Sequence, residues 1–422
     1  MEKWLHWLVR RIAILVVICT TLPLLACNDT PTPPAQETTD SDFESTAPVS
    51  APITEPVTEP GTDPITEPAT EPVTEPEPVK ALAITGGTGE VYPYIDEIKS
   101  YLKAPVRVNV ANYAFEIEYP AQAIRLEWKP LVDNIEGYTL RYFPVGHEQD
   151  TIEVSISKNT QYYELYNLYK ACDYEWSITA KLDSGEDYTE KATFHTSDLG
   201  PRILRIRAVY NTRDAGGYVT ESGLVTKQGM IIRGSALPES LPEHAQKVFT
   251  ETLGIKTELD VRGYTAESGF RAESPIEGAK LEQIQIEGYS DAFKSDWAEN
   301  YRQIFSLMAD PENYPIYIHC TAGADRTGTV IYLLNALLGV PEEQLIQDYE
   351  LTSFSKWGTR STYDPDDGGF GSLMAFFQNR LNRQSGDTLA EKAESYMLSI
   401  GVTQEEIDSI RSIMLENPTT QS

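Results

Sequence analysis

Apolar and polar side chains alternate with a period of two over much of residues 105–197. Short strands with one buried face, separated by turn residues, are typical of an antiparallel sandwich. We therefore predict an all-β domain over residues 105–197. Residues 80–104 stay unassigned as a lead-in, although Tyr94–Leu102 could form a short helix. Four runs have an apolar residue at every second position: Ile124, Leu126 and Trp128; Tyr138, Leu140 and Tyr142; Ile152, Val154 and Ile156; Tyr174, Trp176, Ile178 and Ala180.

The pattern changes after Gly200-Pro201. Helical periodicity then alternates with short apolar runs such as Ile316-Tyr317-Ile318. This alternation is typical of an α/β domain with a parallel or mixed sheet. The predicted fold class is multidomain, with the all-β sandwich followed by an α/β domain over residues 198–422 in which helices flank a central sheet.

The N-terminus predicts an export signal. Three basic residues precede an apolar run over Ile12–Cys19, which is shorter than the roughly 20 residues that a membrane-spanning helix needs. Leu24-Leu25-Ala26-Cys27 follows and resembles the lipobox of bacterial lipoproteins. The resemblance implies a signal peptide over residues 1–26, a lipid on Cys27, and an exported protein anchored to the outer face of the bacterial cell membrane. An uncleaved anchor is the alternative.

Residues 27–79 have the composition of a spacer. From Ala51 to Pro78 the sequence repeats with a period of four, as in Ile53-Thr54-Glu55-Pro56, and residues 28–79 contain no Lys or Arg. Proline at this spacing prevents helix and sheet, and like charges extend the chain. We predict a disordered Thr/Glu/Pro-rich linker over residues 27–79 in preference to a proline-rich recognition ligand.

Charge and cysteine usage exclude some classes of function. The chain has 34 Lys and Arg against 64 Asp and Glu, which gives a formal net charge of −30. Nucleic acids bind basic surfaces, so we expect no nucleic-acid partner. The cysteines have no C-x-x-C spacing, and the histidines lie far apart, so we expect no metal site and no disulfide framework. The four cysteines are Cys19, Cys27, Cys172 and Cys320.

One segment carries the candidate chemistry: His319-Cys320-Thr321-Ala322-Gly323-Ala324-Asp325-Arg326-Thr327-Gly328. A buried strand is predicted before it and an amphipathic helix after it, so the loop joins a strand end to a helix N-terminus. Backbone N–H groups and the helix dipole at such a junction form a site for a phosphate dianion.

Each residue type in this loop suits phosphate chemistry. Arg326 can clamp two phosphoryl oxygens, and the same positive field favours the thiolate of Cys320, the candidate nucleophile. Gly323 allows close approach of the backbone, and His319 can fix the loop from behind. Thr327 is placed to hydrogen-bond the sulfur when it becomes a leaving group. The predicted substrate-binding residues are Thr321, Ala322, Gly323, Ala324 and Thr327.

The loop resembles the signature of the cysteine-dependent protein tyrosine phosphatases, and residues from about Arg207 to Leu415 are similar to the bacterial secreted branch of that family. Its N-x-R-D-x-G-G-Y motif is matched by Asn211–Tyr218, its R-S-x-x-L element by Arg233–Leu237, and its D-L-R element by Asp260-Val261-Arg262. The sandwich looks like a fibronectin type III module, with Trp128 on an early strand and Leu168 placed six residues before Tyr174 as in a tyrosine corner.

The family resemblance implies a two-step phosphatase mechanism that uses no cofactor. Cys320 attacks phosphorus, Arg326 and the loop amides hold the oxygens, and water then hydrolyses the phosphocysteine. By resemblance Asp325 is the leading general acid, with Asp260 behind it. The alternatives are that Asp325 caps the following helix and that Asp260 forms a structural ion pair with Arg262.

The substrate stays open between three hypotheses. The family branch usually has lysine at the position of Ala324, and its absence in an acidic domain favours protein phosphotyrosine over a phosphoinositide or an inositol phosphate. The third hypothesis is a catalytically inert surface protein whose sandwich binds a protein or glycan. A rhodanese-like sulfur carrier has a related loop, but Thr327-Gly328 after the arginine favours phosphatases.

Overall fold

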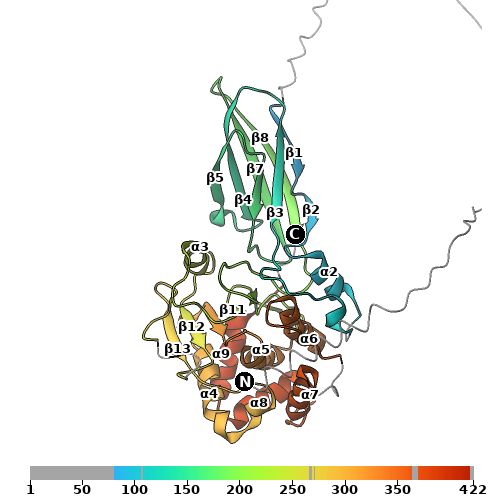
Figure 1. Ribbon diagram of the computed structural model, residues 1–422, viewed down its shortest axis with the longest axis vertical. Helices are drawn as coiled ribbons and strands as arrows, with labels where there is room; N and C mark the ends of the chain where they lie inside the picture. The colour runs from blue at the N-terminus through green and yellow to red at the C-terminus, as the bar shows by residue number, and fades with distance from the viewer. Residues whose placement is uncertain (1–79, 106–107, 266–268, 270, 364–368, 419–422) are drawn as a thin grey trace, which may run out of the picture. The chain divides into compact units, whose positions relative to one another are not determined.

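The computed structural model describes residues 80–105, 108–265, 269, 271–363 and 369–418 (Figure 1). The predicted signal peptide over 1–26, the lipidation site Cys27 and the predicted linker that ends at residue 79 lie outside these residues. All described residues belong to one compact unit of the chain, Pro76–Ser422. Within this described part, the helices are too short or too polar to cross a bilayer.

The first domain is the predicted sandwich of two sheets. One sheet has the strand order β1-β3-β6 and the other β2-β8-β7-β4-β5. Neighbouring strands are antiparallel except β2 and β8, which run parallel. The strands are β1 (Leu82–Gly86), β2 (Gly89–Val91), β3 (Ile124–Pro130), β4 (Ile135–Pro144), β5 (Ile152–Ser157), β6 (Tyr162–Leu165), β7 (Cys172–Leu182) and β8 (Asp187–Thr196).

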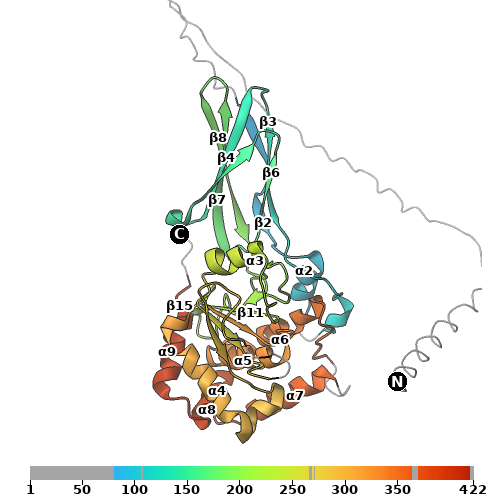
Figure 2. The same ribbon diagram turned by 60° about the vertical axis from the view of Figure 1, so that its left-hand side comes forward.

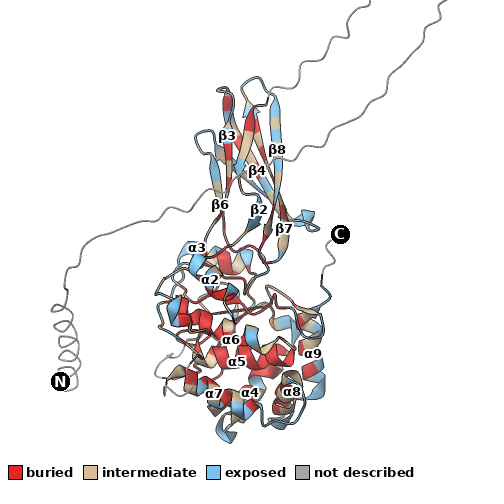
Figure 3. Ribbon diagram, turned by 90° about the vertical axis from the view of Figure 1, so that its right-hand side faces the viewer, coloured by how far each residue is buried: buried red, intermediate tan, exposed pale blue. Residues whose placement is uncertain are grey.

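The alternation of apolar residues is confirmed in β3, β4 and β7, where the inward side chains form the sandwich core (Figure 3). Trp128 and Trp176 are almost fully buried there. Ile152 of β5 is instead 48% exposed. β5 is at the edge of its sheet, so it has a neighbouring strand on one side only. Tyr174 accepts a hydrogen bond from the backbone N–H of Tyr169 at 3.0 Å, as expected of a tyrosine corner.

The sandwich begins earlier than the expected residue 105. β1 pairs with β3 and β2 pairs with β8, so two of its strands come from the unassigned residues 80–104. Both strands are short, and Gly86, Gly87 and Gly89 interrupt the apolar pattern around them. This interruption explains why alternation does not reveal these strands in the sequence.

Residues 92–123, here called the connecting segment, run between β2 and β3 and pack on the second domain. Their helix α2 (Asp96–Lys103) overlaps the expected helix over Tyr94–Leu102. Tyr101 of α2 is buried in one cluster with Leu351 and Phe354 of the second domain. Its hydroxyl donates to Glu350 Oε2 at 2.5 Å, and both groups are buried. The connecting segment therefore joins the two domains.

A second junction lies just after Gly200-Pro201. The buried Arg202 side chain donates from Nε to the carbonyl of Leu168 at 3.0 Å, and its Nη1 lies 3.4 Å from Asp214 Oδ2. Lys170 and Gln228 exchange two hydrogen bonds of 3.0 Å, each between a backbone group and the Gln228 amide. These polar contacts thus join the two domains at a second place, in addition to the apolar cluster of the connecting segment.

The second domain is built on a five-stranded sheet of order β13-β12-β14-β11-β9, parallel except for β9. A short β10–β15 ladder lies outside it. The strands are β9 (Arg213–Asp214), β10 (Val225–Thr226), β11 (Ile231–Gly234), β12 (Thr257–Asp260), β13 (Lys280–Gln283), β14 (Ile316–His319) and β15 (Leu415–Glu416). The helices are α3 (Glu243–Lys247), α4 (Ser295–Met308), α5 (Asp325–Leu337), α6 (Glu342–Glu350), α7 (Phe370–Leu381), α8 (Leu389–Ser399) and α9 (Gln404–Met414).

Apolar clusters lie on both faces of this sheet. Ile316 and Ile318 of β14 pack into the large cluster with α4, α5, α8 and α9, whereas Tyr317 packs on the opposite face near α3 (Figure 2). The expected α/β fold with flanking helices is therefore confirmed. The predicted helix after the loop is α5, but it is buried over Thr327–Leu337 and is therefore a central helix without the polar face of an amphipathic one.

Replacing Tyr101 by Phe keeps the ring in its cluster but removes the donor to Glu350. A buried acceptor that loses its partner costs about 1–3 kcal/mol. We expect the free energy of unfolding, measured by urea denaturation at pH 7, to fall by that amount. Tyr162→Phe is the control, because Tyr162 is 43% exposed on the sandwich. An equal fall in the free energy of unfolding in both variants would show that the buried hydrogen bond to Glu350 stabilises the fold no more than an exposed tyrosine hydroxyl does.

Candidate active site

The candidate loop lies where the central strands of the sheet end. Residues Cys320–Ala324 connect β14 to α5, and the pairing places His319 level with the last residues of β11 and β12. Cys320 is 2% exposed. Gly323 has a φ of +66°, and a Cβ atom there would lie 2.1 Å from the carbonyl oxygen of Gly234. The loop therefore needs glycine at this position both for its conformation and for its packing.

The carbonyl groups of the loop are held from outside. The carbonyl of Thr321 accepts from the backbone N–H of Ala236 at 3.1 Å, and that of Ala322 accepts from Asn211 Nδ2 at 3.0 Å. The carbonyl of Gly323 accepts from Arg233 Nη2 at 2.6 Å. In a trans peptide the N–H points away from the carbonyl, so the amides of residues 322–324 turn to the inner side of the loop. The predicted amide cradle follows from these three bonds.

A buried ion cluster positions the two side chains that hold the loop. Asp348 accepts from Arg213 Nε at 2.6 Å and also from Arg233 Nη1. Arg213 Nη1 in turn donates to Asn211 Oδ1 at 2.6 Å. Burial alone would raise the pKa of Asp348, but the two guanidinium groups outweigh it and hold that pKa below its ordinary value. The motifs around Asn211 and Arg233 thus act on the loop through their side chains.

His319 ties the loop to the neighbouring strand, as its predicted place behind the loop implies. Its Nε2 lies 2.8 Å from Glu258 Oε1 of β12, and its Nδ1 lies 3.2 Å from the carbonyl oxygen of Cys320. Burial would raise the pKa of Glu258, but the contact with His319 holds it below its ordinary value.

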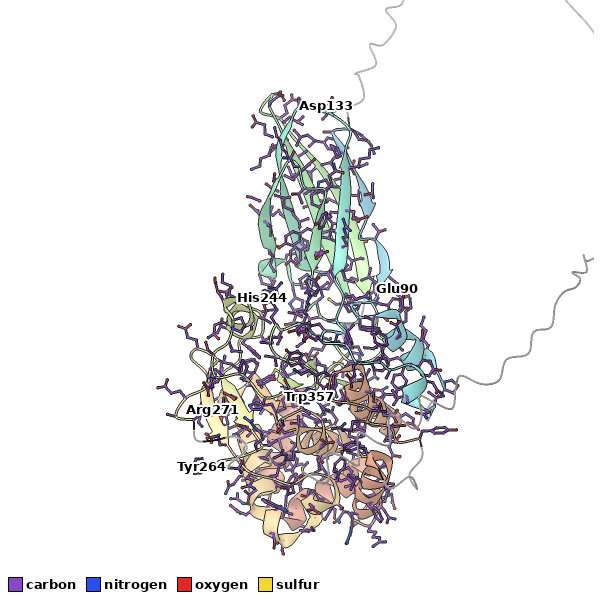
Figure 4. All side chains as sticks on the ribbon, viewed as in Figure 1. Glu90, Asp133, His244, Tyr264, Arg271 and Trp357 are labelled. Carbon is purple, nitrogen blue, oxygen red and sulfur yellow. The ribbon has the colours of Figure 1, made fainter. Side chains whose placement is uncertain are left out.

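Asp260 takes part in ion pairs beneath the loop. Arg262 donates to it from Nε at 2.9 Å and from Nη2 at 2.8 Å, and Arg271 Nη2 lies 3.1 Å away. Arg271, labelled in Figure 4, also contacts Glu258 at 2.6 Å. The Asp260 side chain has no exposed surface. The structure thus contains the ion pair with Arg262 that was the alternative to catalysis by Asp260.

Asp325 is the first residue of α5, but its carboxylate makes no cap for that helix. Both of its oxygens accept hydrogen bonds from Arg360, Oδ1 from Nε at 2.9 Å and Oδ2 from Nη2 at 3.1 Å. The hydroxyl of Tyr289 donates to Oδ1 as well. Among the described residues, the carboxylate accepts from Arg360 and Tyr289, and no helix N–H group donates to it.

A hollow of about 470 Å³ opens beside the loop. Asp325 and Arg326 both line it, whereas Cys320 is not among its lining residues. The other lining residues are Glu287, Gly288, Tyr289, Ser290, Asp291, Phe370 and Leu373. The wall thus combines two apolar side chains of α7 with carboxylates.

Cys320 at the start of the loop and Thr327 in the first turn of α5 are both buried. The hydroxyl of Thr327 has no hydrogen-bond partner among the described residues, so the predicted bond to the sulfur is not formed in this structure. Cys172, the other cysteine among the described residues, is a free thiol on the sandwich.

Three side chains of the site were missed by sequence reasoning. Glu258 stands in a short apolar run, and a charged residue inside a buried strand is a signal that it has a partner. Tyr289 and Arg360 carry no such signal, since both lie in polar loop sequence far from the motif. Tyr289 also has a φ of +58°, which is uncommon outside glycine.

Asp348→Asn should weaken the fold and flatten its response to acid. Because the folded-state pKa of Asp348 is depressed, its stabilisation is present above the unfolded pKa of about 3.9 and is lost as pH falls through the folded value. Removing one partner of a buried ion pair costs about 3–5 kcal/mol. Urea unfolding between pH 7 and pH 3 tests this, with the exposed Asp296→Asn as control. A wild-type acid slope retained in Asp348→Asn would contradict it.

Comparison with known proteins gives a family match for each of the two domains. Residues 204–416, half of the chain, match the tyrosine phosphatase family, and residues 109–196 match the fibronectin type III domain. A tyrosine-protein phosphatase from Nostoc commune is 27% identical over 204 residues, which cover 38% of this chain and 66% of the relative. The match thus spans just under two thirds of that relative. A putative tyrosine-protein phosphatase from Cupriavidus necator is 26% identical over 198 residues, covering 42% of this chain and 72% of the relative.

Among solved structures, the core catalytic domain of the PP-IP phosphatase SIW14 from S. cerevisiae is 21% identical, with a TM-score of 0.25 over 40% of this chain and 93% of that one. The two family matches confirm the resemblances predicted from the loop and from the sandwich. The chain belongs to the tyrosine phosphatase family.

Proposed function

We propose that this protein hydrolyses phosphomonoesters, most favourably protein phosphotyrosine, through a phosphocysteine intermediate on Cys320. The observation that carries the proposal is the outward tie of the carbonyls of Thr321, Ala322 and Gly323. In a trans peptide the N–H is opposite the carbonyl, which supports amides that point to the inner side of the loop. Inward amides at the N-terminus of α5 match the charge of a phosphoryl group and favour a thiolate.

The reaction proceeds in two displacements. The Cys320 thiolate attacks phosphorus and forms an S–P bond while the bond to the leaving oxygen breaks, and the loop amides and Arg326 hold the equatorial oxygens. Water then attacks the phosphocysteine, the S–P electron pair returns to sulfur, and inorganic phosphate leaves. We assign to Asp325 the exchange of a proton with the leaving oxygen or with water, because it lines the hollow beside the loop.

The wall of the hollow supports an aromatic substrate. Phe370 and Leu373 offer apolar surface for a ring, and Leu373 is 41% exposed. Glu287 and Asp291 also line the hollow and would repel further phosphate groups, although Asp291 pairs with Lys294 at 2.8 Å. An inositol phosphate or a phosphoinositide needs several cations at this place. Ala324 adds no charge where the family branch has lysine.

Cys320→Ser tests the proposal. We expect kcat for a phosphotyrosine peptide to fall by roughly 10⁴-fold or more, because the hydroxyl replaces the nucleophile, while binding of the peptide persists. The assay measures phosphate release with a chelator present, and compares phosphotyrosine peptide, phosphoserine peptide, phosphoinositide and phytate. Unchanged turnover would exclude Cys320 as the nucleophile, and absence of turnover in the wild type would favour the inert binding protein.

We also propose that a lipid on Cys27 anchors the protein to the outer face of the membrane, on the basis of the lipobox-like sequence alone. The spacer would then hold the domains away from the bilayer. Cys27→Ala should move the protein from the membrane fraction to the soluble extracytoplasmic fraction and abolish incorporation of labelled fatty acid. Membrane association that survives in this variant would contradict the anchor. The sandwich would face outward, where a protein or glycan ligand is accessible to it.

A further inference from the structure

A second hollow lies in the phosphatase domain, outside the catalytic loop. It has a volume of about 400 Å³ and lies between the start of α4, the end of α7 and the end of α8. Figures 1 and 3 show these three helices together at one end of the domain. Its described lining residues include the cations Lys294, Arg380 and Arg383 and no carboxylate. We call it the basic hollow.

A basic hollow is unusual in a chain whose formal net charge is −30. Lys294 pairs with Asp291 at 2.8 Å, so its charge is partly neutralised. Arg380 and Arg383 are exposed, and within the described part of the chain neither forms an ion pair. A guanidinium binds a carboxylate or a phosphate through two N–H groups. The two arginines therefore give the hollow the capacity to bind an anion.

Aromatic packing fixes the position of the basic hollow. The ring centres of Phe293 and Tyr396, which both line it, lie 4.8 Å apart, and the Tyr396 hydroxyl donates to the carbonyl of Ala292 at 2.7 Å. Phe293 also packs on Phe377 of α7, with ring centres 5.8 Å apart. Helix α7 is thus held against the segment that precedes α4.

Two elements connect the basic hollow with the hollow beside the catalytic loop. Phe370 and Leu373 at the start of α7 line the hollow beside the loop, whereas Arg380 near the end of α7 lines the basic hollow. The 3-10 helix η4 (Tyr289–Phe293) contributes Tyr289 to the first and Phe293 to the second. At 1.5 Å per residue, α7 rises by about 10 Å from Leu373 to Arg380.

The face of α7 between the two hollows is apolar and exposed. Leu373, Phe376 and Arg380 are spaced three and four residues apart, so they share one side of the helix. Leu373 is 41% exposed and Phe376 is 66% exposed. Exposed aromatic side chains beside arginine are typical of surfaces that bind another polypeptide.

We propose that this face of α7 and the basic hollow form a subsite for the peptide that flanks the phosphotyrosine, and that the basic hollow binds an acidic side chain of that peptide. The inference rests on the proposed phosphatase function. An extended peptide rises about 3.3 Å per residue, so the third to fifth residue from the phosphotyrosine reaches the arginines. Glu287 and Asp291 line the hollow beside the loop and disfavour carboxylates directly next to the phosphotyrosine. The substrate class is thus a phosphotyrosine with acidic residues several positions away.

Two phosphotyrosine peptides test the subsite. One has Glu at the third, fourth and fifth positions on both sides of the phosphotyrosine, and the other has Gln at the same positions. We expect kcat/KM of the wild type to be about fivefold higher for the acidic peptide, mainly through a lower KM, as for a few partly exposed ion pairs. The preference should shrink as NaCl is added, because salt screens exposed charges. Equal kcat/KM for the two peptides would overturn the inference.

The double variant Arg380→Gln/Arg383→Gln assigns the preference to the basic hollow. Its kcat/KM values for the two peptides should become equal, and Arg380→Glu/Arg383→Glu should favour the Gln peptide. Arg207→Gln is the matched control, because Arg207 is also exposed but lines neither hollow. A preference retained in the double variant would overturn the inference. So would a rise in activity on both peptides, which would mean that an acidic segment of this chain occupies the basic hollow.

The ratio between the peptides separates the subsite from structural damage and from the proposed function. Damage in the double variant would lower kcat/KM for both peptides and leave their ratio at the wild-type value, which also overturns the inference. If the proposed function fails, the wild type releases phosphate from neither peptide, or Cys320→Ser releases it as the wild type does. If only the subsite fails, the wild type cleaves both peptides with equal kcat/KM and Cys320→Ser cleaves neither.

Discussion

The site depends on one buried carboxylate, that of Asp348, held between Arg213 and Arg233. Charges in a protein interior are costly to desolvate, and a buried ion pair seldom repays that cost in stability alone. Here the ion cluster fixes the orientation of the side chains that hold the loop. The cluster aims Arg233 at the carbonyl of Gly323 and orients Asn211 toward the carbonyl of Ala322. The positions of the loop carbonyls follow from this arrangement.

The fold explains why such a cluster can stand beside the loop. β11 lies next to β14 in parallel register, so Arg233 and the start of the loop emerge at the same end of the sheet. β12 lies on the other side of β14 and brings Glu258 to His319. The loop is thus braced by charged groups from both neighbouring strands.

Strands and helices whose apolar residues recur with a regular spacing could be predicted from the sequence. Strands β3, β4 and β7 follow from alternation, and the strand, loop and helix around Cys320 follow from the spacing of apolar and small residues. Local patterns carry no information on which distant segments meet. The pairing of Arg360 with Asp325 is of this kind, as are the short strands β1 and β2, whose hydrogen bonds go to residues far along the chain.

The path of the connecting segment changes how this chain can be divided. The segment leaves the sandwich after β2, contributes Tyr101 to the phosphatase domain, and returns to the sandwich at β3. The two domains are therefore interleaved along the sequence. A fragment that starts at residue 198 would carry the whole catalytic loop but would expose Leu351 and Phe354 and leave Glu350 without its phenol. A cut between the two domains therefore divides a shared apolar cluster and a buried hydrogen bond wherever it falls after the connecting segment.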